Sequence, residues 1–263
     1  MLTFICCPHA FNDLYGEIQT NSILSWKNLN IPKKIVVCCD EAGAKDFCIK
    51  HDLIHVPNVT VSKNGLPIIS SIFHKGYKYA DDGSPVCYIN SDILLTSDFV
   101  ETLKCFLETY PNLEKYLLCG KRRNWDKPLH INFEDGWEKS IKALNPPLIP
   151  ETCAIDYFVH TKTTYNDIPN YAMGRFLWDN WLLGYCVKNN IFSIDVSNTV
   201  YVIHQMSSYS IKDKKASWND LVNTEEGANN QKIGVPNAVV GNLDMVRMKS
   251  EFKNNKVVFL NKG

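Results

Sequence analysis

Residues 88–93 read YINSDI, a hydrophobic strand that ends in the polar triplet Asn90, Ser91 and Asp92. In open α/β sheets ligands bind at the carboxyl ends of strands, so this triplet stands where a binding site is expected. The alternative is a turn or a helix cap, because these side chains also satisfy nearby backbone amides. The rest of the chain decides between the two interpretations.

Short apolar runs alternate with segments of helical period on both sides of this stretch. Strands are predicted at residues 2–7, 34–39, 53–56, 86–89, 116–119, 154–159, 200–203 and, as a short last one, 257–260. Helices are predicted at 14–26, near 44–48 and at 178–187. A further helix is expected to begin at the turn 65–67, with Pro67 in its first turn, and another after Ser97, which would be its N-cap. This alternation predicts an α/β sheet with helices on its faces.

The composition fits one enzyme domain and excludes several classes of partner. The chain has 263 residues, of which 45% are hydrophobic and 21% charged, enough to bury one sizeable core. Lys plus Arg and Asp plus Glu both number 28, so no broad basic field exists for nucleic acid or an anionic membrane. A small or neutral ligand fits better.

The ten cysteines are predicted to be reduced thiols. They lack the regular spacing of a disulfide scaffold, and the absence of a CxxC motif argues against zinc. The first apolar stretch, residues 2–7, ends at Pro8 and His9 without a basic region before it or a cleavage site after it. We therefore expect neither a signal peptide nor a membrane anchor, and a cytoplasmic location.

Several motifs follow one another along nearly the whole chain. They are FICCP (4–8), IQTNSILSW (18–26), GLP (65–67), NSD (90–92), GKR (120–122), IDYF (155–158), IP (168–169), GR (174–175), WDNWL (178–182), and HQ (204–205) followed by Tyr209. In this order they resemble small GT-A-fold glycosyltransferases of bacteria and large DNA viruses. The metal triplet departs from that pattern, because it begins with Asn90 in place of aspartate.

The resemblance implies a Rossmann-like central sheet, mixed but mostly parallel and flanked by helices. Residues 1–206 would form the catalytic core, and 207–263 a C-terminal extension of the same domain. Residues 207–241, poor in apolar anchors, would form a lid that closes over the donor. The implied activity is transfer of a sugar from a nucleotide-diphosphate donor, UDP-sugar favoured, to a glycan or other hydroxyl acceptor.

A divalent cation, Mn²⁺ or Mg²⁺, would bridge the diphosphate of the donor. Asp92 supplies a carboxylate, and His204 at the end of an apolar strand is a plausible second ligand, since manganese also accepts imidazole. The alternative for His204 is a hydrogen-bonded structural histidine. Asn90 and Ser91 would contact the donor beside this metal.

The remaining donor contacts are expected at other strand ends. Pro8 and His9 end the first strand and Asp40 the second, where a carboxylate can accept the ring N–H of uracil; Asp40 could instead cap the helix that begins near residue 42. Arg122 ends the 116–119 strand and could neutralise phosphate, or be a solvated surface arginine. Arg175, in the GR motif, is assigned to the donor by the resemblance.

Two aspartates compete for the role of general base toward the acceptor hydroxyl. Asp179 lies between Trp178 and Trp181 at a helix start, where this fold often places its acceptor-side carboxylate, and Asp156 begins a strand. Either could instead cap a helix or bind sugar hydroxyls. The two tryptophans are expected in the core or as a sugar platform.

Two other functions are alternatives to glycosyl transfer. A sugar nucleotidyltransferase also holds a metal at a strand end, but it needs a basic, glycine-rich loop after the first strand, and residues 7–12 contain neither glycine nor lysine. A catalytically silent sugar-nucleotide-binding protein would keep the fold and the nucleotide site but would not release the nucleotide from the sugar.

Overall fold

The computed structural model describes residues 1–205, 221–234 and 240–262, and a nine-stranded sheet forms its centre. In chain order its strands are β1 (Leu2–Cys6), β2 (Lys33–Val37), β3 (Ile54–His55), β4 (Pro85–Ile89), β6 (Tyr116–Cys119), β8 (Tyr157–Thr161), β9 (Phe192–Asp195), β11 (Met248–Lys253) and β12 (Lys256–Asn261). Their order in space is β12-β11-β9-β6-β8-β4-β1-β2-β3. Five of the neighbouring pairs are parallel and three antiparallel, which confirms the predicted mixed, mostly parallel sheet.

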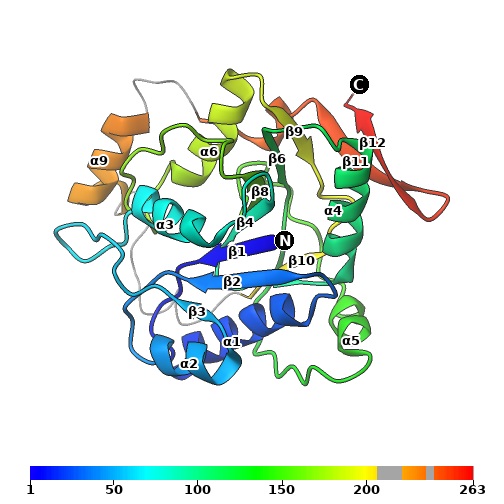
Figure 1. The fold of residues 1–263 in the computed structure, drawn as a ribbon. Helices are drawn as coiled ribbons and strands as arrows, with labels where there is room; N and C mark the ends of the chain where they lie inside the picture. Colours follow the sequence, from blue (N-terminus) through cyan, green and yellow to red (C-terminus); the bar gives the residue numbers. More distant parts are fainter. Residues whose placement is uncertain (206–220, 235–239, 263) are drawn as a thin grey trace.

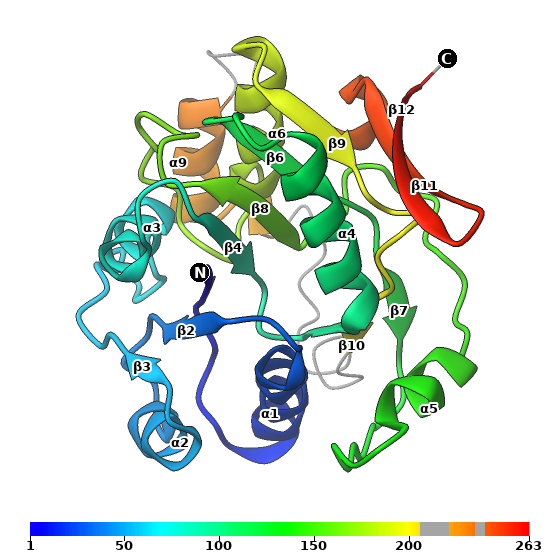
Figure 2. The same ribbon diagram turned by 45° about the vertical axis from the view of Figure 1, so that its right-hand side comes forward.

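Helices cover this sheet on both sides, and a second sheet of three strands lies beside it. The helices are α1 (Asp13–Asn28), α2 (Ala44–His51), α3 (Ile69–Gly76), α4 (Ser97–Thr109), α5 (Trp137–Ala143), α6 (Trp178–Lys188) and α9 (Glu225–Gly234). The small sheet has the order β5 (Ile93–Leu95), β10 (Val202–Gln205), β7 (Arg123–Trp125). Figures 1 and 2 show α1 and α2 on one side of β1 and β2, and α3 on the other.

Alternating side chains of β1 reach the two layers of helices. The Phe4 ring stacks on Trp26 of α1, with centroids 5.6 Å apart, and lies 5.9 Å from Phe99 of α4. Ile5 points the other way, to the end of α3, where a Cβ added to Gly76 would lie 2.5 Å from the Ile5 Cδ1 atom. Glycine is therefore required at this close approach of helix and strand.

Two predicted helix starts are wrong. Ser97 is the first residue of α4 and Thr96 takes the cap position, where its Oγ1 donates to Asp98. Pro67 precedes α3, because the backbone there pairs with another loop: the N–H of Met173 donates to the Pro67 carbonyl at 2.8 Å. The helix predicted near 44–48 is confirmed as α2, which begins at Ala44, two residues after the start expected near residue 42.

The strand predicted at 154–159 begins only at Tyr157 and runs to Thr161, because β8 pairs along its length with β4. The strand predicted at 200–203 is β10, shifted two residues toward its carboxyl end. Six elements were not predicted: β5, β7, β9, β11, α5 and α9. Of these, α9 falls inside the predicted lid, of which residues 207–220 and 235–239 lie outside the described part of the chain.

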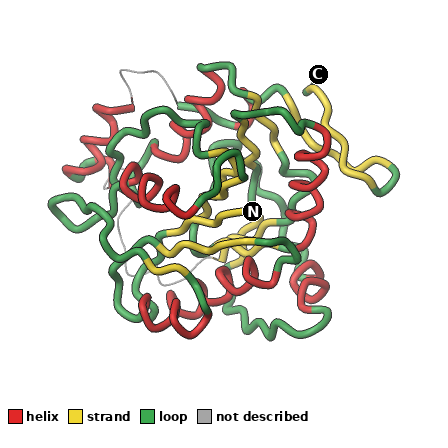
Figure 3. The backbone as a smooth tube through the Cα atoms, in the orientation of Figure 1, coloured by secondary structure: helices red, strands yellow, loops and turns green. Residues whose placement is uncertain are grey.

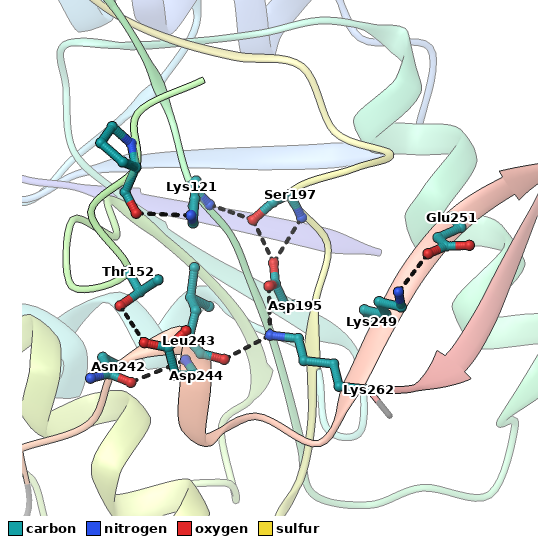
Figure 4. A network of polar contacts seen from close by, with 11 residues as sticks. Lys121, Thr152, Asp195, Ser197, Asn242, Leu243, Asp244, Lys249, Glu251 and Lys262 are labelled. Atoms are coloured by element: carbon teal, nitrogen blue, oxygen red, sulfur yellow. Dashed lines mark hydrogen bonds and ion pairs between the residues drawn. The ribbon is translucent and has the colours of Figure 1, made fainter. Parts of the chain in front are cut away.

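The C-terminal hairpin extends the main sheet at its far end, where β11 pairs with β9 (Figure 3). Its last residues are tied to the core by Lys262, whose Nζ donates to Asp195 Oδ2 at 2.8 Å and to the Leu243 carbonyl at 2.7 Å (Figure 4). Asp195 Oδ1 in turn accepts the N–H of Ser197 at 3.0 Å. The hairpin and the central strands thus form one continuous layer.

All ten cysteines are free, as predicted, and eight of them are buried. Burial raises the pKa of the thiols, to about 12 for Cys38 and about 11 for Cys39, so they pack as small apolar groups. Among the described helices, none has the length and apolar character needed to cross a membrane.

Candidate functional site

Asp92 and His204, the two predicted metal ligands, come together although 112 positions separate them. Asp92 ends the turn after β4 and immediately precedes β5. Strand β10 pairs with β5 in antiparallel register, so that His204 lies opposite Ile93. The N–H of Gln205 donates to the Asp92 carbonyl at 3.0 Å, and His204 Nε2 lies 3.1 Å from Asp92 Oδ2.

This pair is partly shielded from water and incompletely hydrogen-bonded. The side chain of Asp92 is 37% exposed and that of His204 17%. Within the described part of the chain, Asp92 Oδ1 and His204 Nδ1 are buried atoms without a hydrogen-bond partner. An unsatisfied buried polar atom costs about 1–3 kcal/mol, so such atoms at a strand end indicate a site for a bound group.

The two charges favour each other. Burial on its own would raise the pKa of Asp92, but His204, and more weakly Arg122, outweigh it and hold that pKa below its usual value. Burial would likewise lower the pKa of His204, but the Asp92 carboxylate outweighs it and raises that pKa. The raised pKa of His204 and the lowered pKa of Asp92 thus each favour the charged form of the group.

The donor set fits a divalent cation. Asp92 Oδ2 and His204 Nε2, which lie 3.1 Å apart, would hold it, because hard divalent cations bind carboxylate oxygen and manganese also accepts imidazole. Residues 1–205, 221–234 and 240–262 contain no group of three or more His, Cys, Asp or Glu able to hold a metal. The described residues thus offer two ligands, and a substrate phosphate and water would complete the shell.

A second polar cluster, formed by Asn90, Arg122 and Asp156, lies beside this pair. Because Ile89 of β4 pairs with Tyr157 of β8, Asn90 faces Asp156. Asn90 Nδ2 donates to Asp156 Oδ1 at 3.0 Å, and Arg122 Nη1 donates to Asp156 Oδ2.

Arg122 is 21% exposed, and its Nε also donates to Asn124 Oδ1 at 3.1 Å. The interpretation of Arg122 as a solvated surface arginine is therefore wrong. Asp156 is buried with both oxygens engaged, whereas Asn90 Oδ1 is buried without a partner among the described residues. The cluster thus leaves one acceptor atom unsatisfied beside the Asp92 turn.

Asp179 lies in the first turn of α6, as predicted, and is only partly exposed. Its Oδ1 accepts the N–H of Asn180 at 2.8 Å. Burial raises the pKa of Asp179 to about 7; the Asp156 charge adds to the rise, while the Asn180 N–H and Arg122 oppose it. This carboxyl can therefore exchange a proton near neutral pH. Its neighbours Trp178 and Trp181 are buried in the core.

Pro8 and His9 end β1 as predicted and connect to the polar triplet through Gln19 of α1. Gln19 Oε1 accepts the N–H of His9 at 2.5 Å and the hydroxyl of Ser91 at 3.4 Å. Asp40 is exposed beyond the end of β2. Its interpretation as a helix cap is wrong, because Gly43 takes the cap position of α2 with φ of 79°, which favours glycine.

Arg175 is placed away from this group of residues. Its Nε donates to Thr224 Oγ1 at 3.0 Å and its Nη1 to the Gly174 carbonyl at 3.0 Å, so it faces the start of α9. The structure therefore brings Asp92 to His204, and Asn90 and Arg122 to Asp156, and it couples these two groups and Asp179 through charge. It does not bring Arg175 into that set.

No protein-family model and no curated protein sequence matches the chain. Among solved structures, S. aureus TarS 1–349 in complex with UDP-GlcNAc is similar, with 13% identity and a TM-score of 0.50 over 89% of this chain and 70% of that one. The same protein in complex with UDP has 17% identity and a TM-score of 0.49, over 88% of this chain and 69% of that one. The apo-form glycosyltransferase GlyE of Streptococcus pneumoniae TIGR4 has 10% identity and a TM-score of 0.37, over 91% of this chain and 65% of that one.

The fold of the chain is similar to that of TarS. At these identities the likeness concerns the fold alone, and it agrees with the GT-A architecture predicted from the sequence.

Two glutamines support the site and were not singled out as site residues. Gln19 joins the β1 end to Ser91, as described above. Gln205 Nε2 donates to Ser22 Oγ at 2.8 Å, and its Oε1 accepts from Asn21 Nδ2 at 3.2 Å, which fixes the strand that carries His204. The sequence carries a signal for the role of α1, because its polar residues in the 18–26 motif form a polar stripe on a buried helix.

Proposed function

We propose that the chain is a metal-dependent glycosyltransferase that moves a sugar from a UDP-sugar to a hydroxyl of a glycan or other acceptor. The observation that carries the proposal is the Asp92 and His204 pair at the carboxyl edge of the sheet, with one buried atom of each side chain unpartnered among the described residues. These two atoms are available to a bound group at the strand end. The likeness to a protein solved with UDP-GlcNAc supports the fold that this activity needs.

Asp92 and His204 would hold Mn²⁺ or Mg²⁺. When bound, the cation supplies charge neutralisation for the diphosphate that leaves the sugar. Arg122 adds positive charge from the other side: two of its N–H groups bind Asn124 and Asp156, and arginine has five. Asn90 and Ser91 would contact the donor between these charges, and Asn90 Oδ1 is still without a partner among described residues.

The uridine would lie across the ends of β1 and β2. There Pro8 and His9 form one wall and the exposed Asp40 carboxylate is available to accept the ring N–H of uracil. The link from His9 through Gln19 to Ser91 supports this placement, because it connects the proposed base pocket to the proposed metal turn. Arg175 could contact the donor only if its side chain moved away from Thr224, to which it now donates a hydrogen bond.

Asp179 is our choice for the general base. A base works best when its pKa lies near the operating pH, and burial places that of Asp179 at about 7. Asp156 fits a positioning role better, because its two oxygens already accept from Asn90 and Arg122. We place the enzyme in the cytoplasm, a location that ten free cysteines support.

Calorimetry of UDP binding with manganese and with chelator tests the proposal. We expect tight binding only with the metal, and its loss in Asp92→Asn but not in the matched variant Asp195→Asn at the end of β9. Equal affinity in chelator would remove the metal from the proposal. Release of UDP from UDP-sugars, measured in parallel, separates an enzyme from a silent binder.

A further inference from the structure

A cavity of about 370 Å³ lies between α3 and α9, apart from the Asp92 site. Hydroxyl, amide and charged side chains dominate its walls, and none of the described residues that line it is aromatic. They are Thr60, Ser62, Lys63, Ile68, Ser70, Ser71, Asn170, Ala172, Glu225, Glu226 and Asn229. Ligand pockets commonly span about 300–1,000 Å³, so the α3–α9 cavity is large enough for a small ligand.

The floor of the cavity is held by backbone pairing. Ile68 forms an antiparallel bridge with Ala172, and the N–H of Ile69 donates to the Tyr171 carbonyl at 2.9 Å. Ser70 Oγ donates to Asn170 Oδ1 at 2.6 Å across the same junction. The loop that forms this floor leads directly into α6, whose first turn carries Asp179.

The wall contributed by α9 is fixed by two buried side chains. Glu226 Oε1 accepts from Ser62 Oγ at 3.0 Å and from Asn64 Nδ2 at 2.7 Å. Asn230 is fully buried and makes three bonds to the backbone of Ala172 and Phe176, at 2.9 to 3.0 Å. Figures 1 and 2 show α9 beside α6. The cavity is therefore preformed, which lowers the entropy cost of binding.

The charges in the walls disfavour an anion. Lys63 brings one positive charge, but it lies 3.6 Å from Glu225, and Glu226 adds a second carboxylate, so the walls carry one net negative charge. Hydroxyl and amide groups both donate and accept hydrogen bonds, as sugar hydroxyls do. A neutral, hydroxyl-rich ligand matches such walls, while phosphate or a carboxylate does not.

We propose that the α3–α9 cavity is a binding site for the acceptor, and that it takes a neutral sugar unit of a glycan distant from the hydroxyl that is glycosylated. This inference rests on the proposed transferase activity, which gives a glycan chain a reason to lie along the loop toward Asp179. With no aromatic ring to stack on, affinity is expected to be weak and to come from several hydrogen bonds.

The test uses Asn229→Trp, which fills the cavity from an exposed position on α9, and Gln231→Trp, a matched control on the same helix that does not line it. Saturation-transfer NMR on the full chain, without donor, measures binding of neutral oligosaccharides of glucose, galactose and N-acetylglucosamine. We expect at least one to bind wild type and Gln231→Trp, and to bind Asn229→Trp at least about tenfold more weakly.

Failure of binding to all neutral oligosaccharides, equal binding to both variants, or preference for sulfated or phosphorylated sugars would overturn the inference. UDP binding with manganese, measured on the same samples, keeps the two proposals apart. Asn229→Trp should retain it, because Asn229 lies outside the donor machinery. If wild type binds oligosaccharide but no UDP, the proposed transferase function fails while the cavity assignment stands.

Discussion

Two acid–base pairs, one after β4 and one at the end of β9, have similar chemistry and different surroundings. Asp195 is 13% exposed and accepts from Lys262 with one oxygen and from Ser197 with the other, while Lys262 also donates to the Leu243 carbonyl. Asp92 faces His204, and one buried atom of each of those side chains has no partner among the described residues. Satisfaction of polar atoms, more than charge or burial, distinguishes a structural pair from a candidate binding pair.

The largest expected effect is on catalysis at the carboxyl edge. Asp92→Asn should lower turnover by about 10²–10³-fold, because the group that stabilises the leaving diphosphate is lost. Stability should change by less than about 1 kcal/mol, since Asp92 is 37% exposed and its pairing is screened. Steady-state kinetics and thermal unfolding measure the two. If Asp195→Asn impairs turnover as severely, the contrast between the two pairs is wrong.

Asp179→Asn should lower turnover by about 10²-fold and leave UDP affinity nearly unchanged, because the amide keeps the shape but cannot accept the proton. In wild type the base must be ionised, so turnover should fall as pH drops through about 7, the pKa that burial gives Asp179. A pH–rate profile checks this.

Asp156→Asn provides the comparison for that profile. We expect it to lose its pairing with Arg122 and to reduce activity while keeping a pH dependence, shifted to lower pH because the Asp156 charge no longer raises the pKa of Asp179. A normal rate in Asp179→Asn, together with a lost pH dependence in Asp156→Asn, would transfer the base to Asp156.

Asp195→Asn should affect stability instead. It removes the carboxylate that holds both Lys262 and Ser197, and the loss of a charged, largely buried hydrogen-bond acceptor costs about 1–3 kcal/mol. Chemical denaturation measures this, and the matched variant Glu251→Gln, on the partly exposed Lys249 pair of the same hairpin, should cost much less. Equal costs for the two would mean that the Lys262 bonds do not anchor the hairpin.

The smallest effect concerns the stability of the metal-free protein against pH. The raised pKa of His204 contributes stability to the folded state. This contribution is complete below the pKa of about 6.5 that the group has in the unfolded chain, and it is lost as pH rises through the pKa of the folded state. The lowered pKa of Asp92 gives stability that is present above about 4 and is lost as pH falls. Unfolding in chelator should therefore show a decline of less than about 1 kcal/mol above pH 6.5, absent in His204→Gln.

The elements that the sequence predicts best are those with continuous apolar runs, such as β1, β4 and β6, because burial on both faces leaves a clear pattern. Strand β9 was not predicted, because it alternates polar and apolar residues over only four positions. Helix α9, with the sequence EEGANNQKIG, has no apolar stripe. Its position depends on Glu226 and Asn230, whose tertiary bonds local sequence cannot reveal.

The site divides in the same way. Asp92 and His204 were predictable, since each lies at the end of an apolar strand. The bond from Arg122 to Asp156 was not, because it depends on β8 running antiparallel between β4 and β6, and sequence patterns do not give strand order. The distance of Arg175 from the Asp92 pair has a similar origin, since its partner Thr224 belongs to the unpredicted α9 region.

The distribution of thiols offers a practical handle for spectroscopy. Of the ten cysteines, Cys153 alone is exposed, while eight are buried and Cys105 is partly covered. Alkylating reagents need an accessible thiolate, so a maleimide dye should attach mainly at Cys153 in the native protein. The Cys153 carbonyl accepts from Asn180 Nδ2 at 3.1 Å, next to Asp179. A fluorophore there would sit beside the start of α6 without any engineered cysteine, and its emission could follow ligand binding in real time.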